Sequence, residues 1–279
     1  MQTTLPPGYG ETRDRFGYQW TRFHDLAPEF ESHFHAFLGP MDPIEFAGKV
    51  VLDAGCGYGR YALYADKYGA RVVGMDFSEA LESARELVQG KKISLVQGDI
   101  LRPPFTDAGF DMVMSLGVLH HLADPFEGFM QLRRCVGPGG AMVLWLYSSK
   151  RRFSNALIEA LRWMVRRLPN DWLRLVALVL AVPDFWLSKS SAILRILLGE
   201  HLWSEVVPTH FRLYARFPFR VCWADWFDRL GAPIRHYHTK EELENWISFA
   251  GAKGSVTPTE DYGWTVVARF PNSELARHQ

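Results

Sequence analysis

The sequence is poor in cysteine, and none of its cysteines is placed to form a known framework. Among 279 residues only Cys56, Cys135 and Cys222 are cysteines, and no two of them form a C-x-x-C pair. An odd number of widely separated cysteines does not suit a disulfide network or a zinc site. We therefore expect no metal centre and a reducing, cytoplasmic environment.

The sequence also lacks an excess of charge of either sign. Lysine and arginine together number 31, aspartate and glutamate also number 31, and the formal net charge at pH 7 is +0. A protein without an overall positive field has little general attraction for nucleic acid. We therefore expect no nucleic-acid partner.

Long apolar runs are missing as well. Residues 1–15 carry charges and contain no apolar core, so they do not resemble a signal peptide. The longest uncharged apolar run, residues 175–183, is about half as long as the roughly 18 residues that a membrane span needs. The sequence predicts a soluble protein, although a peripheral contact with a membrane stays open.

Short apolar runs alternate with polar, helix-like stretches from residue 49 onward. This alternation predicts parallel strands joined by crossover helices, which is an α/β fold. We expect strands at 50–52, 72–75, 94–96, 112–115, 142–146, 253–256 and 264–270, and helices at 59–68, 78–89 (capped by Ser78), 125–135 (capped by Asp124) and 239–250 (capped by Thr239).

The composition divides the chain into four parts. Residues 1–45 form an aromatic N-terminal cap, 46–150 a cofactor-binding core, 151–236 a helical lid insertion, and 237–279 the end of the core sheet. Within the lid we expect helices at 155–168, 172–182 and 190–202, interrupted by Pro169 and Pro183. The glycine-rich residues 137–140 predict a turn before the fifth strand.

The segment after the first strand is the most informative. An acid, Asp53, is followed by glycine at every second position, Gly55, Gly57 and Gly59, and then by a helix. Glycine permits a positive φ and close approach of a ligand to the backbone, and a helix start offers unpaired N–H groups. Arg60 occupies the place of the third glycine of a dinucleotide site, and Asp53 would repel a pyrophosphate. A ligand with a free amino group and no phosphate fits better.

Acids also end the next two strands. Asp76 follows the second strand, where its carboxylate can accept both hydroxyls of a ribose, and Asp99 follows the third, where it can accept an adenine amino group. The carboxyl ends of parallel strands meet at one edge of the sheet, so we expect the three acids to surround one ligand.

With these pieces in order, the segment from about 49 to 147 resembles the class I S-adenosylmethionine-dependent methyltransferases. The resemblance is carried by residues 51–59, Asp76, 98–99, 110–113, 117–122 and 137–140. It implies a Rossmann-like sheet of seven strands with an antiparallel last strand, and S-adenosylmethionine as the cofactor. The cofactor residues that we expect are Asp53, Ala54, Gly55, Cys56, Gly57, Gly59, Asp76, Phe77, Asp99, Ile100 and Ser115.

Residues 119–125 are similar to those of the small-molecule branch, which modifies ubiquinones, sterols and sugars. His120 and His121 follow the fourth strand, and one of them could act as a general base; we prefer His121. Alternatively, both only support the fold, because methyl transfer is an in-line displacement that alignment and desolvation alone can accelerate. Residues expected to contact the acceptor are Tyr18, Trp20, His210 and Tyr237, although packing is the more frequent role of such side chains.

The function favoured by the sequence is therefore transfer of a methyl group to a small acceptor. We expect the acceptor to be hydrophobic or carrier-linked, a lipid or a glycan, and the reaction to be O-methylation, with N- and C-methylation less favoured. The alternative is a non-catalytic cofactor-binding or scaffold module. The basic amphipathic lid would then hold a partner, a membrane surface or a second copy of the chain.

Overall fold

The computed structural model describes residues 8–259 and 262–272, so the expected cap and the final segment are described in part. The described residues form two compact units. The first contains residues 8–21, 31–151 and those from 233 onward, and the second contains residues 22–30 and 152–232. The cofactor residues expected from the sequence all belong to the first unit, whereas most of the expected lid belongs to the second.

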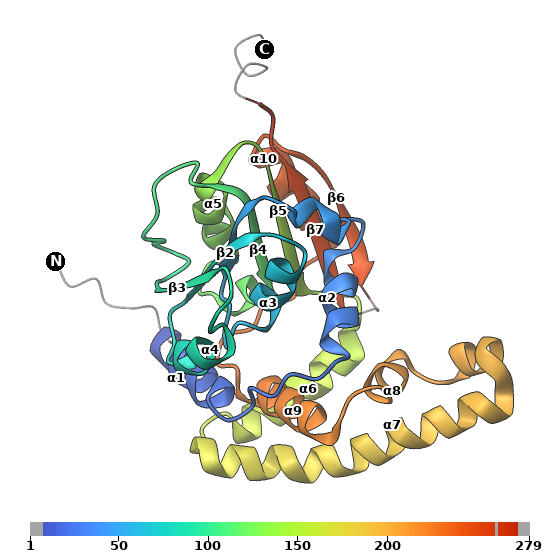
Figure 1. Cartoon of the computed structure of the whole chain (residues 1–279). Helices are drawn as coiled ribbons and strands as arrows, with labels where there is room; N and C mark the ends of the chain where they lie inside the picture. The colour runs from blue at the N-terminus through green and yellow to red at the C-terminus, as the bar shows by residue number, and fades with distance from the viewer. Residues whose placement is uncertain (1–7, 260–261, 273–279) are drawn as a thin grey trace. The chain divides into compact units, whose positions relative to one another are not determined.

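A seven-stranded sheet forms the first unit (Figure 1). Its order is β3-β2-β1-β4-β5-β7-β6, with β1 to β5 parallel and β7 antiparallel to both of its neighbours. The predicted Rossmann-like sheet with an antiparallel last strand is confirmed. The strands are β1 (Val50–Ala54), β2 (Arg71–Asp76), β3 (Ile93–Gln97), β4 (Phe110–Leu116), β5 (Val136–Tyr147), β6 (Lys253–Thr259) and β7 (Gly263–Arg269).

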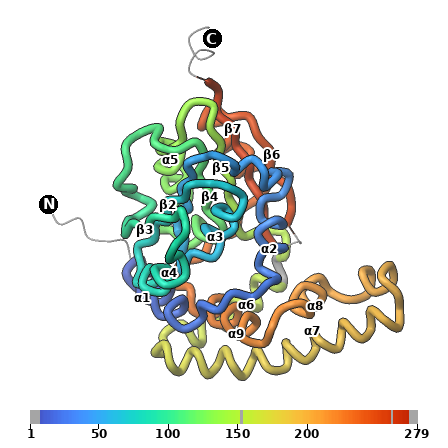
Figure 2. The backbone as a smooth tube through the Cα atoms, viewed as in Figure 1, coloured from blue at the N-terminus to red at the C-terminus, as the bar shows by residue number. Residues whose placement is uncertain are grey.

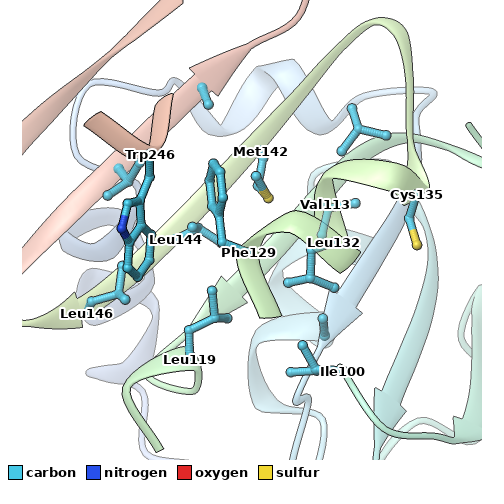
Figure 3. Close-up of a cluster of buried hydrophobic side chains, with 14 of the residues drawn as sticks. Ile100, Val113, Leu119, Phe129, Leu132, Cys135, Met142, Leu144, Leu146 and Trp246 are labelled. Atoms are coloured by element: carbon cyan, nitrogen blue, oxygen red, sulfur yellow. The ribbon is translucent and has the colours of Figure 1, made fainter. Parts of the chain in front are cut away.

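Both faces of the sheet are covered, which explains why its strands have apolar side chains at successive positions. On one face Val113 and Met142 pack with Phe129 and Trp246, which come from the helices α5 and α10 (Figure 3). On the other face Met114 packs among residues of α2, α3 and a short 3-10 helix. These elements are α2 (Phe30–Leu38), η1 (Pro43–Phe46), α3 (Arg60–Lys67), α5 (Pro125–Cys135) and α10 (Lys240–Phe249).

Side-chain caps fix the starts of two helices where the sequence predicts them. Asp124 accepts a hydrogen bond from the Glu127 backbone nitrogen at 2.9 Å ahead of α5. Thr239 and Glu242 form a complete capping box ahead of α10. The third predicted cap is shifted: α4 (Ala80–Leu87) follows Glu79, although the Ser78 hydroxyl still accepts from the Ala80 nitrogen at 3.3 Å.

The first described residues of the chain form a helix that packs within the first unit. This helix, α1 (Tyr9–Trp20), runs beside α4 in both views of the backbone (Figure 2). Gly17 faces the start of α4 so closely that a Cβ there would lie 3.4 Å from the Glu79 nitrogen. A larger residue at position 17 would therefore push α1 away.

Residues 137–140 do not form the predicted turn, because β5 already begins at Val136. A register shift between Phe110 and Met112 brings the two strands unusually close at this point. A Cβ on Gly140 would lie 2.7 Å from the Asp111 carbonyl oxygen. The glycines among residues 137–140 therefore allow β4 and β5 to pair across the register shift. Local turn propensity does not reveal this role.

The second unit consists of helices, and its longest helix corrects a prediction. Pro183 was expected to end a helix, yet α7 continues through it, and the non-helical residue within α7 is Gly199. Asp184, next to Pro183, accepts a hydrogen bond from the Trp226 ring at 2.7 Å, so tertiary contacts hold the helix through the proline. The helices are α6 (Arg152–Val165), α7 (Asn170–Val206), α8 (Thr209–Tyr214) and α9 (Phe219–Gly231).

Replacing Pro183 by alanine should stabilise the protein. Proline inside a helix leaves one carbonyl without its amide partner and costs about 3 kcal/mol, part of which is offset by the stiffer unfolded chain. We expect Pro183→Ala to raise the free energy of unfolding by about 1–3 kcal/mol in urea titrations. Pro169, which precedes the first residue of α7, is the matched control, and Pro169→Ala should have a smaller effect. Equal or lower stability of Pro183→Ala would contradict this account.

Candidate functional site

The three acids predicted from the sequence stand at the same edge of the sheet. Asp53 lies near the end of β1 and Asp76 ends β2, and Ala54 pairs with Met75 in the register between them. Asp99 lies two residues beyond the end of β3, whose last residue Gln97 pairs with Asp76. The topology thus brings three carboxylates from separate strands to one region.

The glycine loop adopts the backbone conformation that its composition predicts. Gly55, Gly57 and Gly59 have φ values of 81°, 55° and 86°, a region that other residues rarely enter. A Cβ on Gly55 would also lie 2.4 Å from a methyl carbon of Val118. The Gly57 nitrogen donates to Asp76 Oδ2 at 2.9 Å, so the second acid fixes the loop that follows the first.

Asp53 is a buried carboxyl group, and one of its two oxygens has no partner among the described residues. Only 2% of the residue is exposed, and its Oδ2 atom has no hydrogen-bond partner in the described part of the chain. Burial, and then the nearby charge of Asp76, raise the pKa of Asp53 to about 8. An ammonium group in this position would satisfy the oxygen and restore the ordinary charge of the carboxyl, so the residue fits the amino group of a bound ligand.

Asp76 combines two roles at the end of β2. Its Oδ1 atom accepts from the Ser78 nitrogen at 2.9 Å and from the Ser78 hydroxyl at 2.6 Å, while Oδ2 holds Gly57. A carboxylate has about four lone-pair sites, so these three bonds leave room for a ligand hydroxyl. Asp76 can therefore hold the glycine loop and still accept a hydrogen bond from a ligand.

Asp99 has a neighbour that the sequence analysis missed. Its Oδ1 atom accepts a hydrogen bond from the hydroxyl of Tyr9 on α1 and another from the Leu101 nitrogen at 2.8 Å. The Tyr9 ring lies edge-on to Phe77, with centroids 5.5 Å apart, and Ile100 is buried beside them. Tyr9 stands ninety residues away from Asp99 in the chain, so no local signal pointed to this contact.

Trp20, also on α1, covers the glycine loop. Its indole lies against Gly57, where a Cβ would be 3.4 Å from the ring, and its centroid is 5.4 Å from that of Tyr58. The Arg60 guanidinium lies over the same ring at 5.4 Å. Trp20, which the sequence predicts to contact the acceptor, thus lies against the glycine loop. Tyr18, on the same helix, is half-buried.

The two histidines follow β4 in the short helix η2 (Leu119–His121). His121 Nδ1 is 2.8 Å from the Ile234 carbonyl oxygen, and its ring centroid is 4.9 Å from that of Phe16. His120 is completely buried and stacks on Tyr147 at 3.8 Å, and neither of its ring nitrogens has a hydrogen-bond partner among residues 8–259 and 262–272. Burial, and then His121, hold the pKa of His120 well below its usual value, so it is a neutral ring.

The remaining predicted residues are not all brought to this edge. Tyr237 stacks on Tyr147 at 6.1 Å and so joins the histidines. His210 belongs to the second unit, where its Nε2 is 2.7 Å from Asp184 Oδ1. The Ser115 hydroxyl is buried and donates to the Ala54 carbonyl at 2.7 Å, which links β4 to β1. Cys56 is buried, its thiol is free of a disulfide, and burial raises its pKa.

Among the residues that the structure describes, no group of three or more histidine, cysteine, aspartate or glutamate side chains is arranged to hold a metal ion. The sheet edge instead carries three carboxylates from separate strands, of which Asp53 is buried.

An α/β fold with this sheet order is shared by many proteins, so the comparison with known families narrows the class. Residues 52–144 match the model of the methyltransferase domain family. This segment is therefore a methyltransferase domain, and S-adenosylmethionine is the cofactor of such domains.

Several known proteins are similar to the chain. A methyltransferase of Encephalitozoon cuniculi is 39% identical over 114 residues, which are 38% of this chain and 51% of that protein. The ubiquinone biosynthesis O-methyltransferase of Cereibacter sphaeroides is 30% identical over 158 residues, 54% of this chain and 61% of that protein. The chain therefore spans between half and two thirds of the length of these two relatives.

A solved structure shares the fold. The magnesium protoporphyrin IX methyltransferase of Synechocystis, crystallised with S-adenosylhomocysteine, superposes with a TM-score of 0.52 at 16% identity. The match covers 92% of this chain and 97% of that one. Because the identity is low, the similarity concerns the fold alone.

The raised pKa of Asp53 makes cofactor binding depend on pH. Below about pH 8 the free protein holds a proton on this carboxyl, and a bound ammonium group would displace it. We expect the affinity for S-adenosylmethionine to rise as the pH increases from 6 toward about 8. Calorimetric titration in buffers of different ionisation enthalpy should show proton release. Asp53→Asn should remove both the binding and the proton release.

The same substitution should stabilise the unliganded protein. The folded-state pKa of about 8 lies above the unfolded value, so the folded protein binds more protons between them and loses stability as the pH rises through this window. At pH 8 the thermal midpoint of ligand-free Asp53→Asn should therefore exceed that of the parent protein, with little difference near pH 4. A lower midpoint at pH 8 would show that Asp53 is stabilised by contacts within the protein.

Proposed function

We propose that this protein transfers a methyl group from S-adenosylmethionine to a hydroxyl group of a small, hydrophobic or carrier-linked acceptor. The observation that carries the proposal is the buried, unpartnered Asp53 oxygen beside a glycine loop that Asp76 ties in place. The bound cofactor would supply an electrophilic methyl group on a sulfonium. The chain's own residues would hold it, exclude water and accept the proton of the acceptor.

Each acid has a distinct part in holding the cofactor under this proposal. Asp53 would bind the amino group, Asp76 the ribose hydroxyls and Asp99 the adenine amino group. Tyr9 would orient Asp99 through its hydroxyl, and its contact with Phe77 would complete the wall on that side. Trp20 would keep water from the loop, since its ring already lies against Gly57.

His121 is the better placed of the two histidines for accepting a proton. A backbone carbonyl can only accept, so the contact with the Ile234 oxygen requires the proton of the neutral ring to be on Nδ1. Nε2 is then the basic nitrogen, the arrangement that general bases commonly use. His120, buried and neutral, would offer a hydrogen bond to the acceptor and position it.

The surroundings of the histidines support an apolar, ring-containing acceptor. Phe16 and Tyr147 bring aromatic rings to the two imidazoles, and Tyr237 stacks on Tyr147. Such rings bind flat apolar molecules by stacking and leave few polar groups to hold a charged substrate. The similarity to an O-methyltransferase of ubiquinone biosynthesis is in keeping with this acceptor class.

Loss of His121 should slow the chemical step. With an acceptor identified by incubating the protein with labelled cofactor and fractionated lysate, we expect His121→Ala to lower kcat about 10²–10⁴-fold, the usual contribution of a general base. Its affinity for S-adenosylmethionine should stay unchanged. His120→Ala is the matched control and should act mainly on KM for the acceptor. If cofactor binding is intact but no acceptor gains a methyl group with the parent protein, the chain is a non-catalytic module.

Asp76→Ala should weaken cofactor binding by at least about tenfold, since it removes a charged hydrogen-bonding partner worth about 1.5–3 kcal/mol. Isothermal titration with S-adenosylmethionine measures the effect. Ser78→Ala is the control, because it removes the hydroxyl that contacts Asp76 Oδ1 while keeping the carboxylate. Equal affinities of Asp76→Ala and the parent protein would reject the ribose assignment.

A further inference from the structure

The helix α7 is apolar on two opposite sides. Its inner side is buried and includes Leu173, Ala177 and Ala181. Its opposite side is exposed, and we call it the outer stripe. Residues three or four apart lie on one side of a helix, so these residues form one continuous line. The outer stripe consists of residues that are between 43% and 74% exposed: Trp172, Leu175, Val179, Val182, Trp186, Ile193 and Leu197.

The far end of α7 exposes further aliphatic side chains. Gly199 has φ 74° and ψ 163°, a conformation that is open to glycine alone, and the chain changes direction there. The tube of the backbone bends back at this end of α7 (Figure 2). The Trp203 ring N–H donates to the Ser191 carbonyl oxygen at 2.6 Å and so fixes the bend. The bend presents a tip formed by Leu194, Ile196, Leu197 and Leu198, of which Ile196 is 83% exposed.

Basic and aromatic residues accompany this apolar surface. Trp163 and Met164, at the end of α6, are 73% and 63% exposed, and the exposed Arg166 and Arg167 follow them. The second unit carries twelve lysines and arginines against nine acids, although the whole chain is neutral. Between residues 175 and 188 the single charged residue is Asp184, which is buried on the inner side.

We propose that the second unit docks on an anionic lipid bilayer, with α7 lying in the plane of the interface. The outer stripe and the tip would enter the boundary between headgroups and acyl chains, and the arginines would contact lipid phosphates. Tryptophan and arginine beside an aliphatic stripe are the side chains that this boundary favours. The docking rests on this surface alone and does not depend on methyl transfer.

The structure favours an α7 helix that lies on the bilayer over one that crosses it. By length and composition α7 is able to span a membrane, in contrast to the expectation from the short uncharged run, because the helix continues through Pro183. Its inner side, however, holds Asp184, which is bonded to Trp226 and His210. A crossing helix would carry this carboxylate and the helices around it into the hydrocarbon.

The charges also favour a bilayer over a second copy of the chain. A copy would bring the same basic surplus, so its net charge would repel that of this surface. An anionic leaflet matches the aliphatic line and the basic residues together.

Flotation of the full chain with vesicles tests the proposal. We expect the protein to float with vesicles of phosphatidylcholine and phosphatidylglycerol, and to bind vesicles of phosphatidylcholine alone several-fold less. Ile196→Glu combined with Leu197→Glu should lower partitioning about tenfold or more, because two apolar side chains leave the interface. Ile44→Glu, at a 65% exposed position of the first unit, is the matched control and should float like the parent protein.

Three further measurements distinguish the possible outcomes. Calorimetric titration with S-adenosylmethionine shows whether the first unit of each variant is intact, and circular dichroism with thermal melting shows whether the helices are. Size-exclusion chromatography with light scattering reports self-association. Absence of flotation by the parent protein, or unchanged flotation of the folded double variant, would overturn the proposal. A dimer that the double variant dissociates, without vesicle binding, would identify a second copy as the occupant.

Discussion

The cofactor edge of the first unit depends on a buried carboxyl group with one oxygen that is unpartnered in the described chain, and this group lies beside a loop of three glycines. Asp53 lies where a charge is costly, and burial together with Asp76 raises its pKa to about 8. A protein can keep such a group when a ligand cation supplies the missing interaction. Asp76 binds the Gly57 nitrogen, so the conformation of the loop and the electrostatics of Asp53 depend on the same residue.

The sheet topology explains why this arrangement forms at one edge. Parallel strands place their carboxyl ends side by side, so acids at the ends of β1, β2 and after β3 become neighbours. The helix α1 then covers this edge with residues from a distant part of the chain: Tyr9 contacts Asp99 and Trp20 contacts Gly57. The N-terminal aromatic residues therefore belong to the cofactor side of the site as much as to an acceptor pocket.

The second unit follows a different physical rule. Its long helix is apolar on the side that packs against its own unit and apolar again on the side that faces outward. Packing within the unit explains the first side, and the proposed lipid bilayer would cover the second.

Local sequence patterns determined much of the secondary structure of this protein and its glycine loop. The strands, the caps at Asp124 and Thr239, and the loop of Gly55, Gly57 and Gly59 depend on residues close together in the chain, so the sequence was sufficient to predict them. Tertiary structure alone decided the rest. The continuation of α7 through Pro183 depends on Trp226, and the contact of Tyr9 with Asp99 joins residues ninety positions apart. Such contacts form only when the whole chain is packed, and no local propensity encodes them.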